Sequence, residues 1–237
     1  MKIAVQLYSV RDCINSAEDF MRVLEEVKAM GYEGVEFAGY HGVDAETIKA
    51  KLDELGLVAV GAHIGVGDYL PEKIEETVKF HKTLGCLHCG TGGAPHDTVE
   101  ECEYAAKALA AGAEALGIPT YYHNHTEEFT PLENGKIGMK IFAEYTKLEL
   151  DTYWSFCAGI DNYSYIMENK DDICLLHVKD GIDRHPKALG EGECDVAAVV
   201  RAAKDAGIEW LVVENDDPVP NGLDDIKRSI TYLKTLM

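Results

Sequence analysis

Short β-rich runs alternate with helical patterns along the whole chain, and this alternation restricts the fold to an α/β class. In residues 20–30, for example, apolar residues recur at three- and four-residue spacing, and Gly31 follows as a stop signal. A helix, a glycine and then a strand form the typical αβ connection of a parallel sheet. The predicted helices are residues 20–30, 48–55, 74–84, 99–116, 196–206 and 223–236.

Eight β-rich runs predict a closed (β/α)8 TIM barrel that forms one domain over residues 1–237. A doubly wound open sheet is the alternative, but it usually has a glycine-rich phosphate turn after its first strand, and none follows Ser9. The predicted strands are residues 2–9, 34–38, 58–64, 86–91, 119–125, 147–152, 173–179 and 210–215.

The composition narrows the function classes. A formal net charge of −20 argues against nucleic-acid binding, which needs a basic face. No apolar run reaches the roughly 18 residues that span a bilayer, and the first residues lack a signal-peptide layout. We therefore expect a cytoplasmic protein without a membrane partner. The oligomeric state stays open, and a homodimer is one of the states we consider.

The seven cysteines are an odd number spread over the chain, so they do not form a disulfide framework. Cys86 and Cys89 have the spacing of a redox or zinc motif. They lie in a predicted strand, where residues three apart point to opposite faces. We interpret both as buried free thiols.

Ionisable residues end nearly every predicted strand, where the chemistry of a barrel takes place. Burying isolated charges is costly, so the presence of several ionisable side chains at one end of the barrel favours a shared cation or a polar ligand. Asp151, His177 and Glu214 come from three successive strands, and carboxylates with imidazoles suit Mn²⁺, Zn²⁺, Co²⁺ or Mg²⁺. His123 and His125 are two apart and share one face of their strand. Each residue alone also fits an ordinary structural hydrogen bond.

A set of short segments occurs along the chain in a specific order: QLYSVR (6–11), GVEF (34–37), YHNH (122–125) with EF (128–129), LDTYW (150–154), AGID (158–161), HVKD (177–180) and LGEG (189–192). In this order, the segments resemble those of the xylose isomerase-like barrel superfamily, which groups sugar and sugar-phosphate isomerases and epimerases with inosose dehydratases and apurinic endonucleases. The resemblance covers essentially the whole chain.

The resemblance implies four metal ligands at the ends of strands five to eight, in the order Glu, Asp, His, Glu. Asp151, His177 and Glu214 match the last three, whereas His123 stands in place of the first glutamate. The two glutamates of the epimerases also form their acid/base pair, and this chain keeps only Glu214. His123 is therefore a metal ligand, a base or a substrate contact.

Further residues are candidates for catalysis or substrate binding. Lys179 either holds or protonates a substrate oxygen, or pairs with Asp180 in a loop. Glu36, His63 and His125 line the pocket or make structural hydrogen bonds, and Trp154 either stacks on a sugar face or packs. We interpret the remaining histidines as surface or structural residues: His41, His81, His88, His96 and His185.

The expected function is a metal-dependent isomerase or epimerase of a sugar or sugar phosphate, acting through a metal-stabilised enediolate with Glu214 as a base. A lyase or dehydratase on a keto-sugar or keto-inositol begins with the same proton removal and is the alternative. A non-catalytic sugar-binding barrel is a third interpretation. An apurinic endonuclease is a fourth, disfavoured by the acidic charge.

Overall fold

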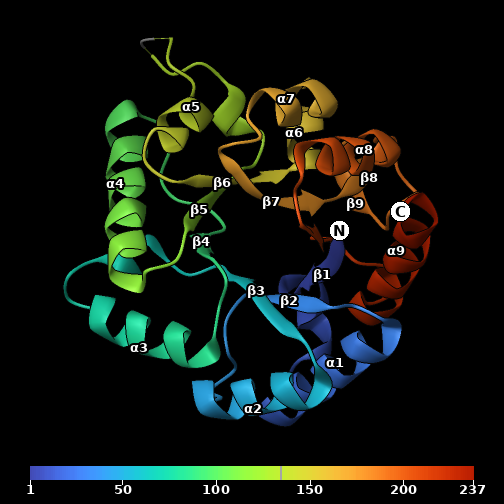
Figure 1. Cartoon of the computed structure of the whole chain (residues 1–237). Helices are drawn as coiled ribbons and strands as arrows, with labels where there is room; N and C mark the ends of the chain where they lie inside the picture. The colour runs from blue at the N-terminus through green and yellow to red at the C-terminus, as the bar shows by residue number, and fades with distance from the viewer. Residues whose placement is uncertain (134) are drawn as a thin grey trace.

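The eight predicted strands are present in the computed structural model, which describes residues 1–133 and 135–237. The strands are β1 (Lys2–Gln6), β2 (Gly34–Phe37), β3 (Val58–Ala62), β4 (Cys89–Thr91), β5 (Thr120–His123), β6 (Lys147–Asp151), β7 (Ile173–Val178) and β10 (Trp210–Val213). They pair in parallel, in the order β3-β2-β1-β10-β7-β6-β5-β4, and the predicted barrel is confirmed (Figure 1). An isolated parallel bridge from His63 to Gly90 joins β3 to β4 and closes the barrel.

Helices surround the strands, and all six predicted helices are present. The predicted stop at Gly31 adopts the left-handed conformation at a helix C-cap, with φ of 94°. Four further glycines cap helices in the same conformation: Gly56, Gly85, Gly117 and Gly207. The α-helices are α1 (Ala17–Met30), α2 (Ala45–Leu55), α3 (Ile74–Leu84), α4 (Val99–Leu116), α5 (Gly138–Ala143), α6 (Thr152–Cys157), α7 (Asn162–Glu168), α8 (Val196–Ala206) and α9 (Gly222–Leu236). The three short helices α5, α6 and α7 were not predicted.

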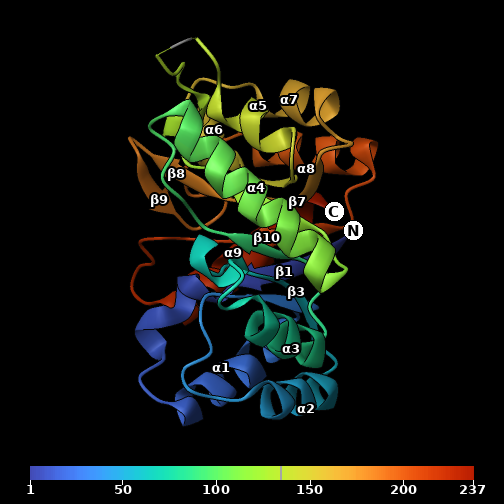
Figure 2. The same cartoon turned by 90° about the vertical axis from the view of Figure 1, so that its left-hand side faces the viewer.

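A short hairpin of β8 (Asp180–Ile182) and β9 (His185–Lys187) extends from the end of β7. In the side view, this hairpin lies at one end of the barrel and both chain termini lie at the other (Figure 2). The hairpin therefore marks the carboxyl ends of the strands. Among the described residues, no helix is long and apolar enough to cross a membrane.

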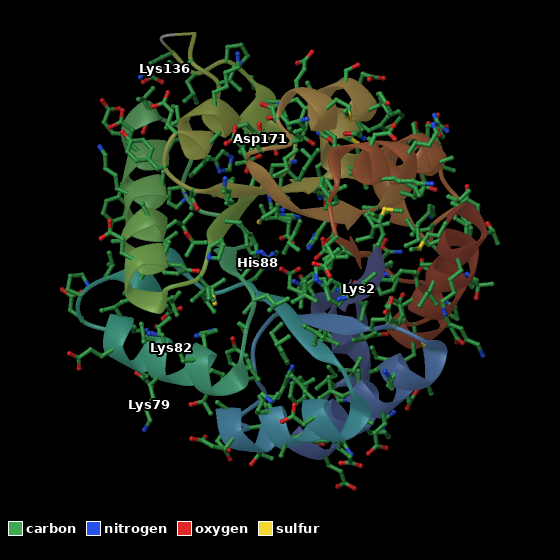
Figure 3. All side chains as sticks on the ribbon, viewed as in Figure 1. Lys2, Lys79, Lys82, His88, Lys136 and Asp171 are labelled. Carbon is green, nitrogen blue, oxygen red and sulfur yellow. The ribbon has the colours of Figure 1, made fainter. Side chains whose placement is uncertain are left out.

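Two apolar layers form the core. Outward-facing strand residues such as Val35 and Leu150 pack against the helices, while a smaller cluster that includes Tyr121 and Val212 fills the barrel interior. Figure 3 shows Lys79 of α3 pointing away from the barrel and His88 lying inside the ring of strands. His88 Nδ1 lies 3.0 Å from the Val60 carbonyl oxygen, in agreement with a structural role.

All eight predicted strands are longer than the observed ones, by three residues at β1, β4 and β5 and by one or two elsewhere. β1 ends at Gln6 because the Gln6 side chain accepts a hydrogen bond from the Tyr8 backbone and caps a 3₁₀ helix over Leu7–Cys13. Cys86 precedes β4 and does not belong to it, so the predicted opposite orientation of Cys86 and Cys89 is wrong. The two thiols are buried, as expected, and contact each other; this contact and burial raise the pKa of Cys89.

Candidate metal centre

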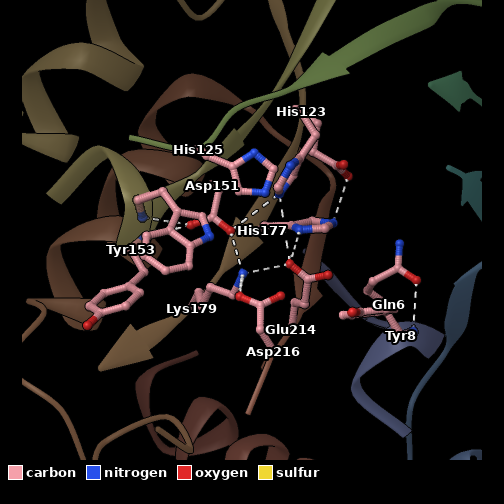
Figure 4. Close-up of polar contacts among 12 residues, drawn as sticks. Gln6, Tyr8, His123, His125, Asp151, Tyr153, His177, Lys179, Glu214 and Asp216 are labelled. Atoms are coloured by element: carbon pink, nitrogen blue, oxygen red, sulfur yellow. Dashed lines mark hydrogen bonds and ion pairs between the residues drawn. The ribbon is translucent and has the colours of Figure 1, made fainter. Parts of the chain in front are cut away.

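Four side chains that could bind a cation meet at the carboxyl end of the barrel (Figure 4). One ligand atom from each of His123, Asp151, His177 and Glu214 lies within 4.8 Å of the others. His123 Nε2 is 3.3 Å from Asp151 Oδ2, and His177 Nδ1 is 3.0 Å from Glu214 Oε2. Parallel pairing causes this convergence, because Asp151 and His177 are register partners on adjacent strands.

Several buried polar atoms of this cluster make no hydrogen bond. Among the described residues, these are both ring nitrogens of His123 and Asp151 Oδ2, although Asp151 Oδ2 also lies 3.3 Å from His123 Nε2 and 3.1 Å from the Lys179 ammonium. The other oxygen of Asp151 accepts from the backbone N–H groups of Tyr153 and Trp154, each at 2.9 Å, which fixes the carboxylate. Buried polar groups are normally satisfied, so these atoms fit a cation of the kind that imidazoles and carboxylates bind.

The protonation states of the ligands differ. Burial, together with the nearby His177 charge, lowers the pKa of His123 to about 3, so its imidazole is neutral and available to a metal. Burial alone would raise the pKa of Glu214, but Lys179 and His177 outweigh it and hold that pKa well below its usual value. For His177, burial lowers the pKa, but Glu149 and Glu214 oppose this and raise it overall.

Lys179 lies inside the cluster and is fully buried. Its Nζ is 3.1 Å from Asp151 Oδ2, 2.8 Å from Glu214 Oε2 and 2.6 Å from Asp216 Oδ2. Burial lowers the pKa of Lys179, yet these carboxylates outweigh it and raise the pKa well above its usual value. The ammonium therefore compensates the negative charge of the cluster.

The alternative pairing of Lys179 with Asp180 is wrong. The Asp180 carboxylate instead accepts from the backbone N–H groups of Gly181, Gly190, Gly192 and Cys194 at 2.9–3.0 Å. A side chain at position 192 would meet Asp180 Oδ1 at 2.1 Å, which explains the glycine there. Asp180 thus ties the loop after β9 to the end of β7.

A cavity of about 570 Å³ opens above the cluster. Of the predicted substrate-binding residues, His63, His125 and Trp154 line this cavity, together with His123 and Glu214. Glu36 is not among its lining residues: it is fully buried beneath His177, with Oε2 2.6 Å from His177 Nε2. A second hollow of about 630 Å³ lies outside the barrel beside α9 and contains none of the predicted site residues.

Two residues of the site were missed in the sequence. Asp216 lines the cavity and contacts Lys179, and Glu149 lies buried between His63 and His177. Glu149 lies on β6 two residues before Asp151, so the two-residue period of a strand was the signal that could have found it. Asp216 lies in the loop after β10, where that period does not apply.

A sequence model described as xylose isomerase-like TIM barrel matches residues 24–236. The chain belongs to this family. Active sites of TIM-barrel enzymes lie at the carboxyl ends of the strands, and the candidate metal centre lies at this end of the barrel. No curated protein matches the chain significantly.

Several solved structures share the fold. A sugar phosphate isomerase/epimerase from Parabacteroides distasonis ATCC 8503 aligns with a TM-score of 0.81 at 20% identity, over 99% of this chain and 98% of that one. The probable 3-DHS dehydratase AsbF of Bacillus anthracis aligns with a TM-score of 0.78 at 16% identity, over 99% of each chain. The IOLI protein with a bound zinc atom aligns with a TM-score of 0.78 at 14% identity, over 100% of this chain and 98% of that one.

Proposed function

We propose that the protein is a metal-dependent isomerase or epimerase of a sugar or sugar phosphate. The observation that supports this most is the convergence of His123, Asp151, His177 and Glu214 within 4.8 Å beneath a cavity of about 570 Å³, which is large enough for a sugar. The sugar phosphate isomerase/epimerase among the similar structures and the zinc atom in the IOLI protein agree with the proposal.

A divalent cation held by these four residues would supply Lewis-acid polarisation of a substrate carbonyl and its neighbouring hydroxyl. Glu214 lines the cavity and is the proposed base for the proton on the adjacent carbon. Lys179, 2.8 Å from Glu214 Oε2, holds that carboxylate in place and in its ionised form. His123, kept neutral by burial, is the proposed fourth ligand.

The cavity wall offers polar groups to a hydroxylated substrate. Trp154 Nε1 is buried without a hydrogen-bond partner among the described residues and is available as a donor. His63 and His125 contribute ring nitrogens at the same wall. An indole ring beside donors and acceptors suits a sugar, whose faces are apolar and whose edges are polar.

A lyase or dehydratase is the second candidate, favoured by the Lys179–Asp216 pair. Asp216 lines the cavity and lies 2.6 Å from the Lys179 ammonium, so a proton for a leaving hydroxyl would pass from this pair through Asp216 after Glu214 removes a proton from the substrate. The probable dehydratase among the similar structures has the same fold. Both reactions share the first proton removal and differ in the second step, which is reprotonation in one and expulsion of the leaving group in the other.

The decisive experiment combines metal analysis with proton exchange. We expect the purified protein, after incubation with Mn²⁺ or Zn²⁺, to hold one equivalent of metal, and Asp151→Ala and His177→Ala to hold none. Keto-sugars and keto-inositols incubated in D₂O would gain deuterium beside the carbonyl, as seen by ¹H NMR. Reprotonated products indicate isomerisation or epimerisation, and loss of water indicates the lyase.

The matched variants are Glu214→Gln and Glu127→Gln. Glu214→Gln removes the proposed base and should abolish exchange, whereas Glu127 is an exposed carboxylate near the cavity and its variant should retain it. Wild-type protein that binds neither metal refutes the proposal and favours a sugar-binding barrel.

A further inference from the structure

Two carboxylates contact the ring nitrogen of His177 that faces away from the cluster. Glu36 Oε2 lies 2.6 Å and Glu149 Oε1 lies 3.1 Å from His177 Nε2. All three side chains are fully buried. Since His177 Nδ1 faces Glu214, the imidazole bridges the candidate metal centre and a second polar layer beneath it.

Glu36 is held rigidly in this lower layer. Gln6 Nε2 donates to Glu36 Oε2 at 2.9 Å, and the Tyr121 hydroxyl donates to Glu36 Oε1. Gly61 of β3 closes the remaining side, because a Cβ there would lie 2.6 Å from Glu36 Oε1. With two donors already bound, the carboxylate is an acceptor, so the group 2.6 Å away at His177 Nε2 must be a donor.

We propose that Glu36 is a positioning residue that holds His177 with its proton on Nε2 and thereby presents Nδ1 to the metal. The inference rests on the proposed metal site. A neutral imidazole has one donor and one acceptor nitrogen, so a proton fixed on Nε2 leaves the Nδ1 lone pair free for a cation. Metal-binding histidines commonly donate their other ring N–H to a carboxylate in this way.

The lower layer also resembles a cation site, since ligand atoms of Glu36, His63, Glu149 and His177 lie within 4.8 Å of one another. Hydrogen bonding favours the positioning role. A neutral His177 cannot ligate through both nitrogens, and His63 Nε2 already lies 2.7 Å from Glu149 Oε2. The two carboxylate oxygens of Glu36 likewise already accept hydrogen bonds from Gln6 and Tyr121. We therefore expect no second cation in this layer, and the metal stoichiometry tests that expectation.

The test is the variant Glu36→Gln in the full-length protein, with Zn²⁺ and Co²⁺ as probes. A glutamine keeps the size of Glu36 but removes its negative charge, so the charge-assisted hydrogen bond that holds the proton on His177 Nε2 is weakened. We expect one equivalent of metal in both proteins, with a dissociation constant about 10–100-fold higher in the variant. Long-range ¹H–¹⁵N NMR of the zinc-loaded wild type should show His177 protonated at Nε2.

Two further variants keep the test decisive. Asp225→Asn removes a buried carboxylate on α9 that accepts from Asn215 Nδ2 at 2.8 Å and contacts none of the four ligands, so its metal affinity should equal that of the wild type. Tyr121→Phe removes only the hydroxyl donor to Glu36 and should weaken metal binding about 2–10-fold if Glu36→Gln does not fold.

The outcomes separate the two proposals. A wild-type protein that binds no metal refutes the proposed function itself. A wild type that binds metal, beside Glu36→Gln or Tyr121→Phe with unchanged affinity, refutes only the positioning role. Two equivalents in the wild type that fall to one in Glu36→Gln would make Glu36 a ligand and overturn the inference in favour of a second cation site.

Discussion

We expect the substitution Lys179→Met to destabilise the metal-free protein by about 3–5 kcal/mol, the usual cost of removing one partner from a buried ion pair. Lys179 Nζ lies within 3.1 Å of carboxylate oxygens of Asp151, Glu214 and Asp216. Its removal leaves these negative charges close together without their ammonium. For a chain of this size the loss corresponds to a melting temperature lower by about 6–20 °C.

The same geometry predicts that a metal rescues the variant. A divalent cation between Asp151 and Glu214 would replace the missing positive charge, so Mn²⁺ or Zn²⁺ should raise the melting temperature of Lys179→Met more than that of the wild type. Urea denaturation and calorimetry, each with chelator and with metal, measure both effects. Lys79→Met is the control, because Lys79 is exposed and its change should stay within about 0.5 kcal/mol.

Two results would refute this reasoning. A Lys179→Met protein as stable as the wild type in chelator would mean that the ammonium does not compensate the carboxylates. An equal rise in melting temperature on adding metal to both proteins would mean that the cation does not bind among those carboxylates.

Three other outcomes are expected from the contacts. Asp180→Ala should cost about 3 kcal/mol or more in urea unfolding because it leaves four backbone N–H groups without their acceptor, and an unchanged midpoint would contradict this. Because the pKa of His177 is raised in the metal-free protein, metal binding should release a proton from this residue. At pH values below that pKa, the metal affinity should therefore rise about tenfold per pH unit. A binding heat in isothermal titration calorimetry that does not depend on the ionisation enthalpy of the buffer would argue against this proton release. Trp154→Phe should raise KM about 3–10-fold with little change in kcat, since it removes one neutral donor, and an unchanged KM would assign Trp154 to packing.

The sequence alone determined the barrel and most of the candidate metal centre. Alternating periods of two and 3.6, with glycines after the helices, define strands and helices locally, because both patterns depend only on near neighbours. Parallel strands then bring their carboxyl ends together, so strand-end residues such as Asp151 and His177 had to meet.

Only the tertiary structure decided the partners of each side chain. It separated Glu36, buried beneath His177, from His63 at the cavity wall, although both lie near a strand end. It also paired the Lys179 ammonium with the Asp216 carboxylate, and it directed the Asp180 carboxylate to the backbone N–H groups of the loop after β9. These choices depend on distances across the closed barrel, between residues up to 141 positions apart in the case of Glu36 and His177, and no local pattern encodes such distances.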